Sequence, residues 1–152
     1  MTTATPPATE ECTCFAVRSA ARHVTQLYDQ FLAPTGLRVT QFSILAKLKR
    51  TGPLAINALA DQMVMDRTTL GRAVQPLERE GLIRIEPAPS DRRAKELHLT
   101  RAGEKRLQAG LKAWSKAQAR FDAAFGAKRA AELRTLLRAV VASPIHADRP
   151  NR

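Results

Sequence analysis

The spacing of hydrophobic residues in this 152-residue chain changes near Ile83 from the period of a helix to the period of a strand. Upstream, Leu70, Val74 and Leu77 recur at steps of three and four, which is the spacing of a buried helix face. Downstream, apolar and polar residues alternate over 83–86 and again over 96–99, as they do in strands with one buried face. The turn-rich basic segment 87–94 separates these two runs. The pattern predicts a helix followed by a β-hairpin with a long basic tip.

The predicted helix has a clear start and a clear stop. Asp66 is placed to cap its first turn, because a carboxylate accepts bonds from unpaired N–H groups and suits the positive end of the helix dipole. Gly81 stands where a left-handed residue ends a helix, and Leu82 can fold back on Leu77 in a Schellman closure. A helix between these two residues is therefore expected.

A shorter apolar pattern over 56–63 predicts a second helix immediately upstream. Only Val64 and Met65 separate it from Asp66, a connection typical of a helix-turn-helix. Ala55 occupies the cap position where Ser or Thr would be usual, at a cost of about 1 kcal/mol in local stability. The sequence therefore predicts a helix-turn-helix followed directly by a hairpin wing.

The helix that follows Asp66 carries Thr68, Arg72, Gln75 and Arg79 opposite its apolar face. Hydroxyl, guanidinium and amide groups are the types that hydrogen-bond base edges and phosphates. Arg92 and Arg93 lie at the hairpin tip, and a narrow minor groove attracts Arg through its negative potential. An ordinary solvated loop is the alternative interpretation of this tip.

In these segments the chain resembles the MarR family of bacterial transcriptional regulators. The matching stretches are Leu59-Ala60, Asp66-Arg67-Thr68-Thr69-Leu70, Leu77-Glu78-Arg79-Glu80-Gly81-Leu82-Ile83, Asp91-Arg92-Arg93, and Leu97-x-Leu99-Thr100-x-x-Gly103. The resemblance implies a homodimer that binds pseudo-palindromic DNA and responds to a small molecule or an oxidant. It makes Arg93 the minor-groove residue and Thr68, Thr69 and Arg72 the major-groove readers. The candidate DNA-binding residues are Arg67, Thr68, Thr69, Arg72, Gln75, Arg79, Arg92 and Arg93.

Apolar stripes at both ends of the chain indicate dimerisation helices, because they exceed what a small winged core needs to cover itself. The first stripe comprises Cys14, Val17, Ala21, Val24, Tyr28 and Phe31, and the last comprises Leu133, Leu136, Leu137, Val140 and Val141. We expect a mostly α fold with a small β-hairpin wing. Its parts are a disordered tail over 1–10, a dimerisation helix over 11–35, a winged helix-turn-helix over 38–100, dimerisation helices over 101–142 and a flexible tail over 143–152. Intramolecular packing into a monomer is the alternative.

The net charge of +11, from 25 Lys and Arg against 14 Asp and Glu, indicates a polyanionic partner. Charge alone would fit DNA, RNA or an anionic membrane. The chain shows neither a signal-peptide pattern nor an apolar run of about 20 residues, so a cytoplasmic protein is expected. No catalytic, cofactor or metal-ligand motif stands out, so we expect no enzyme activity, cofactor or metal site.

The sensing chemistry has two candidate sites. Cys12 and Cys14 lie at the start of the first helix, where the dipole favours a thiolate. The favoured alternative is that Cys14 is a small hydrophobic residue of the dimer stripe and that Cys12 lies inert at the solvent edge. A bond between them is not expected, because residues two apart on a helix point to opposite sides. Cys14-Phe15-Ala16 and Tyr28 resemble the peroxide-sensing branch of the family, but Arg18 replaces its second tyrosine.

The resemblance also implies an effector cleft beside the dimer helices. Arg18, Arg22, His23 and Tyr28 are its candidate lining residues, and an anionic aromatic molecule would suit the two arginines. The expected function is a dimeric, sequence-specific transcriptional repressor that a small effector releases from DNA. A thiol-based redox sensor and a non-specific architectural DNA- or RNA-binding protein are the alternatives.

Overall fold

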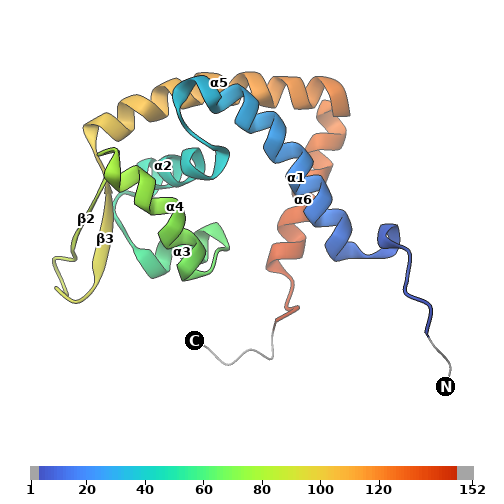
Figure 1. Cartoon of the computed structure of the whole chain (residues 1–152), viewed down its shortest axis with the longest axis horizontal. Helices are drawn as coiled ribbons and strands as arrows, with labels where there is room; N and C mark the ends of the chain where they lie inside the picture. The colour runs from blue at the N-terminus through green and yellow to red at the C-terminus, as the bar shows by residue number, and fades with distance from the viewer. Residues whose placement is uncertain (1–3, 147–152) are drawn as a thin grey trace. The chain divides into compact units, whose positions relative to one another are not determined.

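The computed structural model describes residues 4–146, and these form a mostly helical fold with a small antiparallel sheet (Figure 1). The expected fold class is therefore confirmed. Parts of both predicted tails, residues 1–3 and 147–152, lie outside the described residues. The helices are α1 (Thr13–Leu32), α2 (Val39–Thr51), α3 (Ile56–Met63), α4 (Arg67–Arg79), α5 (Arg101–Phe125) and α6 (Ala127–Ala142), with 3-10 turns at Thr9–Glu11 and Ala33–Thr35. The chain forms two compact units that meet within α5, one up to Ser115 and one from Lys116.

The sheet of the first unit has the strand order β1-β3-β2. The wing hairpin consists of β2 (Ile83–Pro87) and β3 (Lys95–Leu99), paired from Ile83 opposite Leu99 to Pro87 opposite Lys95. The short strand β1 (Leu54–Ala55) pairs with the other edge of β3, so the wing has a third strand that the alternation of the sequence did not predict. This strand ties the start of α3 to the base of the wing.

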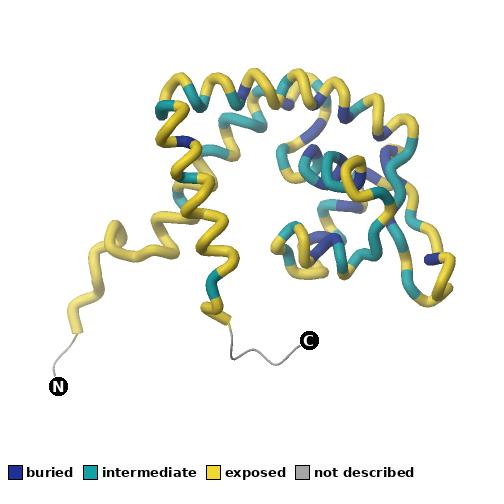
Figure 2. Tube along the Cα trace, turned by 180° about the vertical axis from the view of Figure 1, so that it is seen from behind, coloured by how far each residue is buried: buried dark blue, intermediate teal, exposed yellow. Residues whose placement is uncertain are grey.

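The core of the first unit lies where α2, α3 and α4 pack against the inner face of the sheet. Figure 2 shows the dark blue buried segments concentrated in this part of the chain. Leu45, Leu59, Leu70, Leu77 and Leu97 are 0% exposed. This core holds the helix-turn-helix and the wing as one body.

Both ends of α4 are closed as predicted. The Thr69 backbone N–H donates to Asp66 Oδ1 at 2.8 Å, and the Thr69 hydroxyl donates to Asp66 Oδ2 at 2.7 Å. At the other end Gly81 has φ 71°, its N–H donates to the Glu78 carbonyl at 2.9 Å, and the Leu82 N–H donates to the Leu77 carbonyl at 2.9 Å. These two bonds make the Schellman motif, so α4 has fixed limits on the surface of the core.

The start of α5 is fastened to the end of α4 through Thr100. The Thr100 hydroxyl donates to the Gly81 carbonyl at 2.6 Å, and the Gly103 N–H donates to that hydroxyl oxygen at 3.0 Å. The Thr100 N–H donates to the Leu82 carbonyl at 3.1 Å. A side chain at Gly103 would collide with the same carbonyl, because its Cβ would lie 2.0 Å from the Leu82 oxygen.

Asp29 of α1 helps to hold α2 in place. Its Oδ1 accepts the N–H of Val39 at 2.7 Å, which satisfies an unpaired donor in the first turn of α2. At the other end of α2, Lys49 pairs with Glu104 of α5 at 2.7 Å. This pair is exposed and contributes about 1 kcal/mol at most.

The second unit contains the end of α5 and α6, which Gly126 joins with φ 98°. The rings of Phe121 and Phe125 stack with centroids 5.4 Å apart, and the Arg129 guanidinium lies 4.3 Å from the centroid of Phe125. Farther along α6, large apolar side chains are exposed, namely Leu136, Leu137, Val140 and Val141. The predicted apolar stripe therefore faces outward. No helix in the described part of the chain is long and apolar enough to cross a membrane.

Candidate nucleic-acid interface

α4 has two chemically distinct faces, as its sequence predicted. Leu70, Val74 and Leu77 are at most 2% exposed. Thr68, Arg72, Gln75 and Arg79 are all exposed, and at about 100° per residue they form one narrow stripe opposite Leu70 and Leu77. The helix thus presents a row of hydrogen-bonding groups to the outside of the core.

Two other candidates on α4 lie beside this stripe. Thr69 is exposed, but its hydroxyl proton is engaged by Asp66, which leaves only the oxygen as an acceptor. These bonds from Thr69 hold the pKa of the Asp66 carboxyl below its usual range. Arg67 is exposed on the side of α4 that faces the wing.

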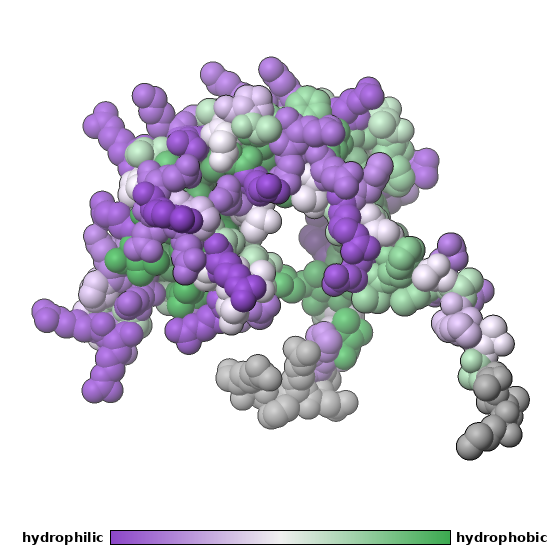
Figure 3. Space-filling view, viewed as in Figure 1, coloured by the Kyte–Doolittle hydropathy of each residue, from purple (hydrophilic) through white to green (hydrophobic). Residues whose placement is uncertain are grey.

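The wing tip is a turn held by Asp91. Asp91 Oδ1 accepts the N–H of Arg93 at 3.0 Å, and the Asp91 carbonyl accepts the N–H of Ala94 at 3.0 Å. Arg92 and Arg93 are exposed around this turn. Figure 3 shows hydrophilic side chains projecting from the wing and over α4 in the same view.

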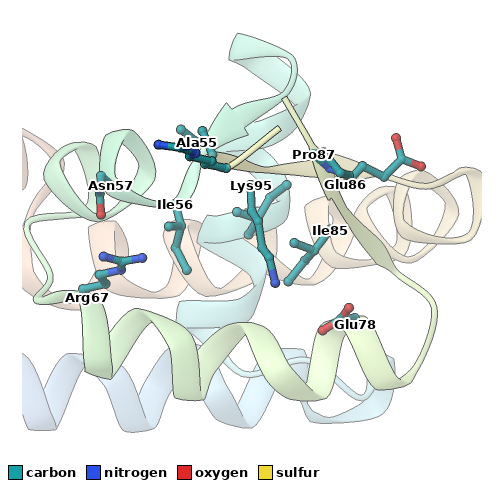
Figure 4. A pocket seen from close by; sticks show the side chains of 12 residues that line it. Ala55, Ile56, Asn57, Arg67, Glu78, Ile85, Glu86, Pro87 and Lys95 are labelled. Atoms are coloured by element: carbon teal, nitrogen blue, oxygen red, sulfur yellow. The ribbon is translucent and has the colours of Figure 1, made fainter. Parts of the chain in front are cut away.

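A cavity of about 780 Å³ separates α4 from the wing. It is lined by the cations Arg67, Arg93 and Lys95 together with Glu78 and Glu86. Figure 4 shows Ile56, Ile85 and Lys95 extending toward α4 from their own elements. Lys95 was missed at the sequence level, although it shares the inward face of β3 with Leu97 and could have been found from that alternation.

The candidate effector residues lie on α1. Arg18, Arg22 and His23 are exposed and Tyr28 is half-buried. A second cavity, of about 560 Å³, lies near the end of α1 and is lined by Gln26, Asp29, Gln30, Ala33, Gly36, Leu37 and Arg38. None of the four candidates lines either of these two cavities.

Cys12 and Cys14 are free and exposed thiols. Cys12 is the residue that precedes α1 and its backbone is extended, whereas Cys14 lies in the first turn. The premise that both cysteines lie on the helix is therefore wrong, and the geometric argument against a bond between them does not apply. Among the described residues, no cluster of His, Cys, Asp and Glu could hold a metal ion.

Comparison with known proteins identifies this arrangement. A sequence model of the MarR family matches residues 37–95, which include the helix-turn-helix and most of the wing. The transcriptional regulator MosR of M. tuberculosis is 34% identical, with a TM-score of 0.75, over 90% of this chain and 100% of that one. A structure of MosR in complex with DNA is 35% identical, with a TM-score of 0.75, over 87% of this chain and 98% of that one.

A probable transcriptional regulator from Pseudomonas aeruginosa has a TM-score of 0.78 and 28% identity, over 88% of this chain and 99% of the other. A comparison with curated proteins finds no match. The similarity to MosR extends over nearly the whole chain. The chain belongs to the MarR family of winged-helix, DNA-binding transcriptional regulators.

Proposed function

We propose that the protein is a homodimeric transcriptional repressor that binds a pseudo-palindromic operator and leaves it when a small effector binds. The observation that carries this proposal is the exposed polar stripe of α4, which lies opposite a fully buried apolar face. A helix with this arrangement can enter the major groove while its core holds it at a fixed angle. MosR, which is similar along nearly its whole length, has been solved in complex with DNA.

The groups on α4 have different roles in this proposal. Arg72 and Gln75 carry the guanidinium and amide groups that recognise guanine and adenine edges in the major groove. Arg67 and Arg79 lie at the two ends of the helix, where the phosphate backbones pass, and fix its register. Thr68 and Thr69 supply oxygen atoms at the first turn, with Thr69 as an acceptor because Asp66 engages its proton.

The wing adds contacts on the outer side of the major groove. Arg93 enters the adjacent minor groove and Arg92 contacts phosphate, since guanidinium groups are favoured where the minor groove is narrow. Asp91 fixes the turn that presents them. Lys95 adds a third cation at the base of the tip, facing α4.

Dimerisation uses the apolar residues that the described chain leaves exposed. On α6 these include Leu136 and Val141, which are 65% and 62% exposed, and on α1 they include Phe15 and Val17, at 42% and 41%. An isologous pairing would bury both sets in a symmetric interface. It would place two copies of α4 in successive major grooves about 34 Å apart, which defines a pseudo-palindromic operator.

The effector in this proposal is an anionic aromatic molecule. Arg18 and Arg22 lie one turn apart on α1 and would face its carboxylate, with His23 and Tyr28 near its ring. Equilibrium binding of salicylate and benzoate, compared in the parent and in Arg18→Ala, Arg22→Ala double variants, tests this assignment. Equal affinity in the two proteins would remove these residues from the effector site.

A thiol-based redox sensor is the second candidate function, and the exposure of both cysteines favours it. A disulfide between Cys12 and Cys14 would form as both S–H bonds break, while hydrogen peroxide takes up the two electrons and two protons and its O–O bond breaks to give two molecules of water. DNA binding that peroxide abolishes and dithiothreitol restores, in the parent but not in Cys12→Ser or Cys14→Ser, would support it. DNA binding insensitive to peroxide would exclude it.

Selection from a random duplex library tests the main proposal. Purified protein at about 0.15 M salt should enrich an inverted repeat with half-sites about one helical turn apart. An Arg72→Ala variant, selected in parallel, should enrich a site with relaxed preference at one position in each half. Failure of the parent to enrich any motif would indicate a non-specific architectural binder instead.

A further inference from the structure

Gly71 is an unexplained glycine in the middle of α4. Of the seven glycines, it alone has neither a positive φ nor a close neighbour. The other six divide into Gly36, Gly52, Gly81 and Gly126, with φ between 71° and 98°, and Gly103 and Gly110, whose Cβ would come within 3.0 Å of another atom. At Gly71 an added Cβ would meet nothing within 4 Å.

The fold therefore gains nothing from a glycine at this position. A glycine inside a helix is less favourable than alanine, because it loses more backbone freedom on folding. Alanine would fit here without strain and would be the better helix former. The open space at this position leaves room for a partner outside the chain.

The side chains around Gly71 indicate the kind of partner that would fill this space. The residues three and four positions away include Arg67, Thr68 and Gln75, which are exposed hydrogen-bonding groups of the candidate DNA-binding set. The half-buried Gly71 is thus a gap between exposed polar side chains, one turn along α4 from Arg67, which lines the cavity toward the wing. Such a gap allows the helix backbone to approach a flat, polyanionic partner more closely than a continuous row of side chains would.

We infer that Gly71 is the point of closest approach between α4 and the base edges of the operator, and that its missing side chain is a specificity determinant. This inference rests on the proposed function. A methyl group at this position would be overpacked against the base pairs and would move Thr68 and Gln75 away from the base edges. Stability and operator affinity should then change in opposite directions when alanine replaces this glycine.

The test compares Gly71→Ala with the parent in thermal unfolding and in binding to the selected operator. The melting temperature should rise by about 2–4 °C, and operator affinity should fall about tenfold or more. The affinity for a random duplex of equal length should change by less than about twofold, because phosphate contacts dominate binding to random DNA. Ser115→Ala, which improves helix propensity at an exposed position of α5, is the matched control and should raise stability without changing operator affinity.

The outcomes separate this inference from the proposed function. Unchanged or tighter operator binding by Gly71→Ala would overturn it, and so would an equal loss on operator and random DNA. Gly71→Leu provides a graded second variant, since leucine forms helices well and should abolish operator preference. If the parent protein shows no preference for any duplex, the result contradicts the proposed function itself. The role of Gly71 at base edges, which depends on that function, is then contradicted as well.

Discussion

Replacement of Gly103 by alanine should disconnect the end of α4 from the start of α5. The new Cβ would lie 2.0 Å from the Leu82 carbonyl oxygen and 2.7 Å from Leu99 Cδ1. Carbon and oxygen atoms approach no closer than about 3.3 Å even in favourable contacts, so the backbones must separate by about 1.3 Å. The Leu82 oxygen belongs to the backbone, so rotation of a side chain cannot relieve this clash.

The cost follows from the contacts that this separation breaks. Overpacking against a rigid backbone costs about 3 kcal/mol, at the upper end of the usual range. Loss of the bond from the Thr100 N–H to the Leu82 carbonyl adds about 1 kcal/mol, and the better helix propensity of alanine returns about 1 kcal/mol. The expected loss is about 3 kcal/mol of unfolding free energy.

Urea unfolding followed by circular dichroism measures this loss directly. Gly71→Ala is the matched control, because it makes the same chemical change where the structure leaves open space. The two variants should differ in sign, with Gly103→Ala destabilised and Gly71→Ala stabilised. A Gly103→Ala protein as stable as the parent would refute the close approach of α5 to Leu82.

Three further predictions concern DNA contacts, pH and assembly. Arg72→Ala should weaken operator binding by about 1–3 kcal/mol and relax base preference in gel-shift titrations. Arg93→Ala should weaken operator binding through loss of the wing contact. Unchanged operator affinity in both variants would displace both residues from the interface. Because the pKa of Asp66 is lowered in the folded state, the stabilisation from its ionised form is complete above the ordinary carboxyl pKa of about 3.9 and is lost as pH falls toward the folded pKa. The melting temperature of the parent should therefore fall relative to Asp66→Asn below about pH 4, and a difference independent of pH would contradict this. Leu136→Asp should yield a monomer in light scattering while Arg138→Asp, on the same helix, remains dimeric; a dimeric Leu136→Asp would argue against α6 as the interface.

The local signals in the sequence were enough to predict the helix-turn-helix. Asp66 and Gly81 close α4 through bonds within a few residues, so their chemistry determines the ends wherever the helix packs. The alternation of Ile83 and Ile85 with charged residues likewise predicted β2. The exposed stripe of α4 followed from the same periodicity.

Features that depend on distant contacts could not be predicted. β1 has only Leu54 and Ala55, too few residues to show a period, and it forms because the edge of β3 is available. Asp29 caps α2 from ten positions away, so no local motif reveals it. The functional interpretation of Gly71 required the structure, since an unneeded glycine is recognised only when its surroundings are known.

The specificity ratio on DNA tests the central claim most directly. Protein at about 0.15 M salt would be titrated, by fluorescence anisotropy, against the selected operator and a scrambled duplex of equal length. A sequence-reading α4 predicts a preference of about a thousandfold or more for the operator. Equal affinity for the two duplexes would mean that phosphate contacts alone hold the protein on DNA, and it would contradict the account.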